Sequence, residues 1–145
     1  PRSTLFPYTT LFRSLGLNEK EANEIGHVLG LPPAQSTPVA LSRLAHEIAD
    51  KLPIHTLVVH PTRFAVAVTA GQVSVAKGLY TAKPLITTGA GDHFNAGFCL
   101  GKLLGFADDL ALLVGVTNSG HYVRTAQSPT VPQLAAQLQA WPNEW

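Results

Sequence analysis

Hydrophobic residues recur along the middle of the chain with two different periods. In "VALSRLAHEIADKL" (residues 39–52) they return every three or four positions, which is typical of a helix with one buried face. The run "IHTLVVH" (54–60) is β-branched and bounded by prolines, so it predicts a buried strand. "RFAVAVT" (63–69) and "QVSVAKGL" (72–79) alternate around "AG", which predicts a β-hairpin with alternating faces.

The N-terminal flank of this region predicts one more strand and one more helix. Residues 15–30 begin with apolar positions and continue into helix formers, so we expect a strand end, a turn at Asn18 and a short helix that ends at Gly30. A loop follows over residues 31–38, in which Ser36 or Thr37 is available to cap the next helix.

The C-terminal flank predicts three helices, over residues 92–104, 107–124 and 128–141. Gly115 and Gly120 suggest close packing of the second, and the third has proline in its first turn. Because strands and helices alternate along the chain, we predict a layered α/β domain.

Composition narrows the function classes. The 145 residues are 46% hydrophobic and 13% charged, which is typical of a packed globular domain. The net charge is +1 without a basic cluster, so we expect neither nucleic acid nor an anionic membrane as a partner. No apolar run approaches the roughly 20 residues that span a bilayer. The single cysteine, Cys99, predicts no internal disulfide, a reducing compartment and a small buried side chain.

The ends of the sequence suggest a fragment. The chain contains no methionine, and its opening "PRSTLFPYTTLFRS" is similar to translated linker or adapter sequence. We therefore expect residues 1–14 not to be native and residues 15–145 to carry the fold.

A glycine-rich turn, "TTGAGD", carries the clearest chemistry. Strand-like residues end at Thr88, and a helix is predicted to open at about Asp92. Glycines at such a junction leave backbone N–H groups open to an anion, and the helix dipole adds to the attraction. A phosphoryl group held there would place Asp92 where it could accept a proton from a substrate hydroxyl.

The same residues also fit a simpler interpretation, in which Asp92 is a helix N-cap and the glycines form a tight turn. Other ligand classes fit less well. The run lacks the third glycine of G-x-G-x-x-G and the Lys-Ser/Thr of a P-loop, and the histidines show no metal-ligand spacing.

The whole run "TTGAGDHFNAGF" resembles the C-terminal signature of the ribokinase-like (PfkB) carbohydrate kinase family, D-T-T-G-A-G-D-x-F-x-x-G. After the first position every fixed residue matches: Thr87, Thr88, Gly89, Ala90, Gly91, Asp92, Phe94 and Gly97. Upstream, "LNEKEA" (17–22) is similar to the family's N-x-x-E element. The resemblance covers essentially residues 15–140 and corresponds to the C-terminal, ATP-side half of a family member.

The resemblance implies a three-layer ribokinase-like fold, with a central, largely parallel sheet and helices on both faces. It also implies a kinase that moves the γ-phosphoryl group of ATP to a sugar-like hydroxyl. Carried over, Asp92 is the general base, and Gly89, Ala90 and Gly91 build the anion hole. The implied partner is a small sugar or sugar-like molecule, and the implied location is cytoplasmic. The resemblance leaves open whether the full-length parent is a homodimer.

The resemblance also implies Mg²⁺ as a cofactor. Asn18 and Glu21 occupy the matching positions of N-x-x-E, and they would act indirectly, by holding the water shell of the ion. Oxygen ligands suit that role because Mg²⁺ keeps several waters. The alternative is a helix-capping Asn18 with a solvated Glu21.

Three departures from the family pattern bear on the site. Ile86 stands where the family usually has the Asp of a monovalent-cation loop, so we expect a weak response to potassium. His60, Pro61 and Thr62 replace a T-x-G turn that contacts the nucleotide. Asn118 falls near the base-binding side of its helix, or is polar surface.

Two functions of different classes follow. The first is an ATP-dependent sugar kinase whose C-terminal portion is this chain. The second is a non-catalytic nucleotide- or anion-binding relic of the same fold. Ile86 and the altered "HPT" turn favour it, and the intact Asp92, Asn18 and Glu21 disfavour it. The sugar-binding residues of the family lie outside the matching half, so the sequence does not identify the sugar, and we expect residues 15–145 to be inactive alone.

Overall fold

The computed structural model describes residues 14–141, which form four strands and five helices. In chain order these are β1 (Ser14–Leu17), α1 (Glu19–Val28), α2 (Pro38–Lys51), β2 (Thr56–Val59), β3 (Phe64–Thr69), β4 (Gln72–Lys77), α3 (Ala90–Leu103), α4 (Asp108–Thr125) and α5 (Val131–Gln139). The prediction for residues 1–13 lies outside the described part of the chain.

The four strands form one sheet in the order β1-β2-β3-β4. Only β1 and β2 run parallel, with Leu17 opposite Val59, and the other two pairs are antiparallel. The prediction of a largely parallel sheet is therefore wrong for this part of the chain. The reason is the length of the connections: α1 and α2 supply one crossover, whereas β2, β3 and β4 follow one another through short turns, which allow only antiparallel pairing.

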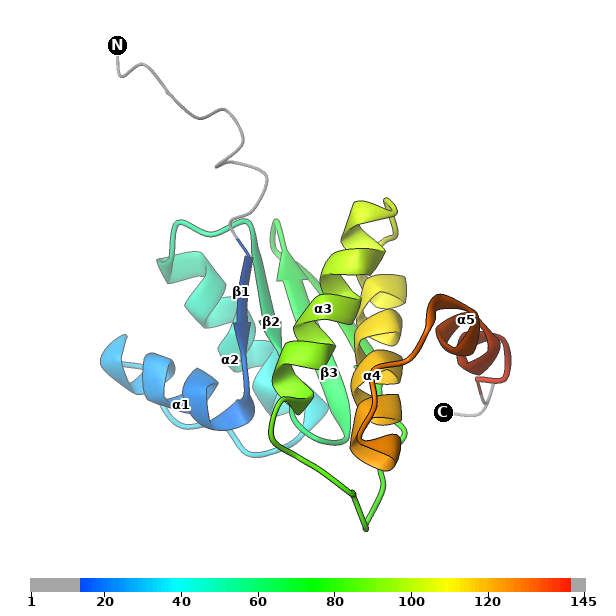
Figure 1. Cartoon of the computed structure of the whole chain (residues 1–145). Helices are drawn as coiled ribbons and strands as arrows, with labels where there is room; N and C mark the ends of the chain where they lie inside the picture. The colour runs from blue at the N-terminus through cyan, green and yellow to red at the C-terminus, as the bar shows by residue number, and fades with distance from the viewer. Residues whose placement is uncertain (1–13, 142–145) are drawn as a thin grey trace, which may run out of the picture.

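The sheet lies between two helical layers, as predicted (Figure 1). The helices α1 and α2 cover one face, and α3 and α4 cover the other. Strand β3 alternates between the two: Phe64, Val66 and Val68 pack toward α1 and α2, and Ala65 and Ala67 toward α3 and α4. Both sets are buried, which explains why this strand is apolar throughout.

Side-chain caps fix where α1, α2 and α5 begin. Asn18 caps α1, and Thr37, one of the two predicted candidates, caps α2 by accepting from the Ala40 amide at 3.2 Å. The last helix is shorter than predicted, because Thr130 and Gln133 form a capping box that starts it after residue 130.

Helices α3 and α4 pack through glycines at very short range. A Cβ atom added at Gly97 would lie 2.8 Å from the Val114 carbonyl oxygen, and one added at Gly115 would lie 2.8 Å from the Phe94 ring. The predicted close packing at Gly115 is thus confirmed. At Gly120 an added Cβ meets only the end of the Arg124 side chain, so that glycine is not a helix contact.

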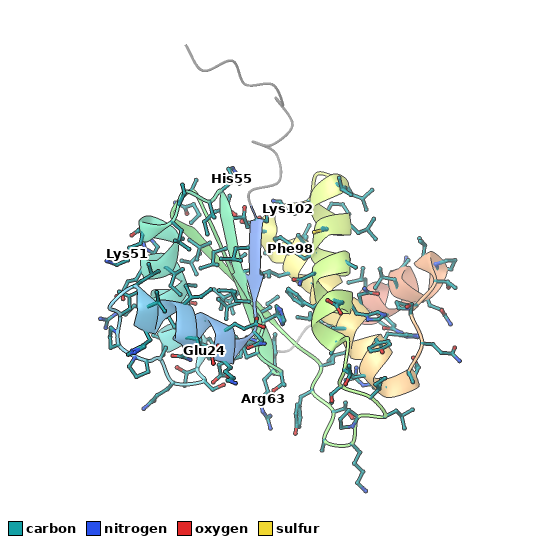
Figure 2. All side chains as sticks on the ribbon, turned by 60° about the vertical axis from the view of Figure 1, so that its left-hand side comes forward. Glu24, Lys51, His55, Arg63, Phe98 and Lys102 are labelled. Atoms are coloured by element: carbon teal, nitrogen blue, oxygen red, sulfur yellow. The ribbon has the colours of Figure 1, made fainter. Side chains whose placement is uncertain are left out.

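Cys99 does not take the buried position expected of it. Its side chain is exposed on α3, where Phe94, Gly97, Phe98 and Gly101 form the buried face. Figure 2 shows Phe98 on the side of α3 that faces the sheet. The apolar run around Cys99 is longer than one helical face, so sequence alone did not show which of its residues is left outside.

Candidate active site

The glycine-rich turn leads directly into α3. The Ala90 amide donates to the Thr87 carbonyl at 3.1 Å, which closes the turn. Gly89 takes the N-cap position with a φ of 85°, a left-handed conformation that side chains disfavour. The helix therefore begins at Ala90, two residues before the predicted start at Asp92.

The amide groups of Gly91 and Asp92 remain open. Within residues 14–141, neither donates a hydrogen bond to another residue. Unpaired amides in the first turn of a helix, together with the helix dipole, favour an anion at that position. This is the arrangement that an anion hole needs, and the anion hole itself stays a prediction.

Asp92 lies in the third position of α3 with its side chain exposed. The N-cap interpretation of this residue is wrong, because Gly89 occupies the cap. Among the described residues the Asp92 carboxylate makes no hydrogen bond or ion pair, and it stands beside the open amides of the turn. A free carboxylate at this place can accept a proton.

Asn18 and Glu21 form a capping box at the start of α1. The Asn18 amide donates to Glu21 Oε2 at 2.8 Å, and the Glu21 amide donates to Asn18 Oδ1 at 2.9 Å. The capping role considered for Asn18 is therefore confirmed, and Glu21 shares it rather than only facing solvent. Both residues are exposed, so the box does not exclude the role near Mg²⁺, which stays a prediction.

These separate segments meet at one end of the sheet. Strands β1 and β2 are parallel, so Asn18 and His60, which follow them, lie at the same edge (Figure 1). The His60 amide donates to the Leu17 carbonyl at 2.9 Å. A Cβ atom added at Gly91 would lie 3.2 Å from His60 Cε1, so the anion turn closes directly over this histidine.

His60 is held as a half-buried ring between the sheet and α3. It stacks on Phe94 with ring centroids 4.7 Å apart. Burial lowers the pKa of the imidazole below its ordinary value of 6.5, while its own backbone and the negative charge of Glu21 oppose that shift. The neutral ring is therefore favoured at the junction of the turn with the sheet.

A cavity of about 410 Å³ opens beside the turn. Four segments line it: the loop after β2, the chain between β4 and α3, the first turn of α3, and one face of α4. The lining residues are His60, Pro61, Thr62, Phe64, Gly78, Leu79, Tyr80, Thr81, Ala82, Pro84, Thr87, Ala90, Gly91, Phe94, Val116, Ser119, Gly120 and Val123. This volume is in the range of small-molecule sites.

Only some of the site residues predicted from the sequence line the cavity. Ala90 and Gly91 line it, whereas Asn18, Glu21 and Asp92 lie outside its wall. Asn118 does not line it either, because its side chain amide donates to the His93 carbonyl at 2.6 Å. The prediction that Asn118 faces a base-binding side is therefore not supported by its contacts.

Sequence reasoning missed the segment 78–84, which forms much of the cavity wall. Tyr80 lines the cavity, and the Arg63 guanidinium lies 3.9 Å from the centre of the Tyr80 ring. Arg63 is at the end of the sheet that carries the turn (Figure 2). The exposed apolar pair Leu79–Tyr80 just before the glycine-rich signature was the one available signal.

Two features are absent from residues 14–141. Among them, no group of three or more His, Cys, Asp or Glu side chains is placed to hold a metal ion. None of their helices is both long and apolar enough to cross a bilayer.

Comparison with known proteins identifies the family. The model of the prokaryotic ketohexokinase family matches residues 14–141, which is nearly all of the chain. The chain belongs to the prokaryotic ketohexokinase family. A 56-residue stretch is also 45% identical to a ketohexokinase of Haloferax volcanii, and it covers 39% of this chain and 15% of that protein.

Solved structures of ribokinase-like enzymes share the fold. Arabidopsis thaliana ribokinase, complexed with ribose and ATP, superposes with a TM-score of 0.72 at 20% identity over 87% of this chain and 40% of its own. Thermotoga maritima ribokinase superposes with a TM-score of 0.70 at 19% identity, over 90% of this chain and 43% of its own. A nucleoside kinase of Methanocaldococcus jannaschii, an archaeal member of the ribokinase family, superposes with a TM-score of 0.66 at 18% identity. The match covers 88% of this chain and 40% of that kinase.

These likenesses confirm the predicted ribokinase-like α/β fold and the predicted kinase family. The chain spans 43% or less of the length of each structure named and 15% of the Haloferax volcanii ketohexokinase. The residues matched here therefore correspond to one portion of the shared fold.

Proposed function

We propose that this chain is the nucleotide-side portion of an ATP-dependent kinase that phosphorylates a ketohexose. One observation carries the proposal: the open amides of Gly91 and Asp92 stand at the rim of a cavity, beside the unpaired carboxylate of Asp92. Phosphoryl transfer needs little covalent chemistry from the protein beyond positioning, charge stabilisation and a base. The turn offers all three at one place.

The reaction assigns a role to each part of the turn. Asp92 accepts the proton of the sugar hydroxyl while the hydroxyl oxygen forms a bond to the γ-phosphorus of ATP. The bond between that phosphorus and the bridging oxygen breaks, and ADP leaves with the electron pair. The turn Gly89–Gly91 places the open amides of Gly91 and Asp92 where they can donate to the phosphoryl oxygens, on which negative charge is concentrated during transfer.

The cavity fits the remainder of the nucleotide. Its walls combine apolar side chains, such as Leu79, Tyr80 and Val123, with the hydroxyl groups of Thr81 and Ser119. Binding sites for flat, hydrogen-bonding ligands are commonly built from such a mixture. ATP is bound in the Arabidopsis thaliana ribokinase of similar fold, which supports the same ligand here.

Asn18 and Glu21 are proposed to hold the water shell of Mg²⁺. The ion, when bound, neutralises charge on the phosphates. The Glu21 carboxylate and the Asn18 side-chain oxygen suit this role, because Mg²⁺ takes few protein ligands and keeps several waters. Glu21 uses Oε2 in the capping box, so its other carboxylate oxygen is available to a water.

A ketohexose is proposed as the acceptor because the family is that of prokaryotic ketohexokinases. The resemblance places the sugar-binding residues outside the portion matched here, so the acceptor rests on the family and the transfer chemistry on the turn. A cytoplasmic location and a homodimeric parent stay predictions.

Nucleotide binding can be tested on the chain as it is. Calorimetric titration with MgATP should give one site, and the Gly89 and Gly91 amide signals in a ¹H–¹⁵N spectrum should shift on binding. A matched variant, Gly91→Ala, should weaken binding because its Cβ would press against His60. Saturating MgATP that leaves both glycine signals in place would contradict the proposal.

A test of phosphoryl transfer needs a hybrid kinase. In this hybrid, residues 14–141 replace the corresponding C-terminal portion of the Haloferax volcanii ketohexokinase. With fructose and MgATP, Asp92→Asn in this hybrid should lower kcat by about 10²–10⁴, the usual contribution of a general base. The melting temperature and ATP affinity should stay close to those of the parent hybrid. A hybrid that binds MgATP but transfers no phosphate with Asp92 intact would favour the non-catalytic relic.

A further inference from the structure

Four carbonyl groups around the anion turn accept hydrogen bonds from side chains. Four such bonds are present, three of them from α4: Tyr122 Oη to the Thr88 carbonyl (3.1 Å), His93 Nδ1 to the Gly89 carbonyl (2.8 Å), Ser119 Oγ to the Ala90 carbonyl (3.0 Å) and Asn118 Nδ2 to the His93 carbonyl (2.6 Å). The turn is therefore fixed on its α4 side by donors that no motif of the sequence singled out.

Holding these carbonyls also orients the amides. In a planar trans peptide the C=O and the following N–H point in opposite directions. With the Thr88 carbonyl turned toward Tyr122, the Gly89 amide points away from α4. With the Ala90 carbonyl turned toward Ser119, the Gly91 amide does the same.

We propose that His93 and Tyr122 are positioning residues for phosphate binding: Tyr122 holds the Thr88 carbonyl toward α4, so that the Gly89 amide points away from it, and His93 holds the Gly89 carbonyl and stacks on the Tyr122 ring. This inference rests on the proposed function of the turn. Neither side chain would touch the nucleotide, since neither lines the cavity.

The pair is itself tightly placed. The two rings stack with centroids 3.6 Å apart and an angle of 12° between their planes. On its far edge, His93 Nε2 lies 2.9 Å from Ser128 Oγ. Because the Gly89 carbonyl can only accept, Nδ1 must carry a proton; in the neutral ring Nε2 then accepts from Ser128. One face and two edges of the imidazole are thus occupied, which fixes its orientation.

Substitutions can separate the hydrogen bond from the packing. His93→Phe keeps a ring to stack on Tyr122 and loses the donor to Gly89. His93→Asn keeps an N–H donor near the position of Nδ1 and loses the ring. Tyr122→Phe removes only the hydroxyl that reaches Thr88. His46→Phe, on α2, is the matched control, since it removes a histidine from the other side of the sheet.

Each variant of the chain is measured in two ways: the Gly89 and Gly91 amide signals without ligand, and the Kd for MgATP. His93→Phe and Tyr122→Phe should shift both signals and raise Kd about two- to tenfold, the effect of losing one hydrogen bond. His93→Asn should restore most of the affinity, and His46→Phe should change neither readout. Melting temperatures report packing separately.

The proposal is overturned if His93→Phe and Tyr122→Phe leave the glycine signals and Kd unchanged. It is equally overturned if His93→Asn binds as weakly as His93→Phe, because the ring rather than the donor would then matter. If the unmodified chain fails to bind MgATP, the proposed function fails, and the ligand-free glycine signals still decide whether the two side chains orient the turn.

Discussion

The two faces of the sheet are packed by different means. Among the largest fully buried side chains, all except Leu112 belong to the core under α1 and α2. The core under α3 and α4 is richer in alanine and contains two phenylalanines, and glycines bring the two helices into contact along their backbones. The first face, under α1 and α2, is packed by large apolar side chains. The second face, under α3 and α4, is packed by close contact between helix backbones.

The difference matters because the second face carries the turn. Close contact between α3 and α4 is what lets Ser119 and Tyr122 reach the carbonyls of residues 88 and 90. Larger side chains between these helices would move the donors out of reach. Changes in the first face should therefore alter stability alone, whereas changes in the second should alter both stability and ligand binding.

The largest effect on stability is expected in the first face. Ile48→Ala removes a fully buried side chain from α2 and should lower the free energy of unfolding by about 2–5 kcal/mol. Urea denaturation measures the loss. At a temperature where the variant remains folded, its Kd for MgATP should match that of the unmodified chain, and a weakened Kd would contradict the separation of the two faces.

Overpacking the second face should have a smaller effect on stability but a broader one on function. Gly97→Ala places a Cβ against the Val114 carbonyl, and such crowding costs about 1–3 kcal/mol. It should also raise the Kd for MgATP by displacing α4. The matched control for stability is Gly120→Ala, whose Cβ meets the end of the Arg124 side chain rather than a neighbouring backbone and should destabilise the helix less.

Glu21 offers a test in which stability and metal use separate. Glu21→Gln keeps an oxygen that can accept from the Asn18 amide, so the capping box and the melting temperature should persist. Loss of the charge should raise the Mg²⁺ concentration for half-maximal activity of the hybrid kinase about tenfold, as for residues that act through a metal-bound group. An unchanged Mg²⁺ titration would contradict the role near the metal and leave helix capping as the only role of Glu21.

The smallest expected effect is a pH dependence that arises from His60. Its pKa is lower in the folded chain than in the unfolded one. At pH values between these two pKa values, the unfolded chain therefore binds more protons than the folded chain. The contribution to stability is complete above about pH 6.5 and is lost as the pH falls through the folded pKa. Denaturation midpoints from pH 7.5 to 5 should therefore fall less in His60→Gln than in the unmodified chain.

How much could be predicted from sequence depended on how local each feature is. The cap at Asn18 and the helix after Gly89 follow from neighbouring residues, and both were predicted to within two positions. The direction of the strands was not, because it depends on which strand pairs with which. Cys99 was misplaced for a similar reason: helical periodicity shows a buried face only once the neighbouring helix is known.

The site shows the same division. Asp92 and the glycines stand together in the sequence, so their juxtaposition could be predicted, whereas His93 and Tyr122 are 29 positions apart and meet only because α3 and α4 pack closely. The segment 78–84 was missed because its residues have no periodicity and acquire their place from the elements around them.

The pairing of β1 has a consequence for how the protein folds. Leu17 pairs with Val59 across 42 positions, whereas β3 and β4 are joined by a two-residue turn. Closing the longer loop costs more chain entropy, so β2, β3 and β4 should assemble before β1 joins them. Among the described residues β1 pairs with β2 alone, and Asn18 and Glu21 follow it directly. The two residues proposed to serve the metal thus belong to the segment that should open first, and amide exchange should be faster in β1 than in β3.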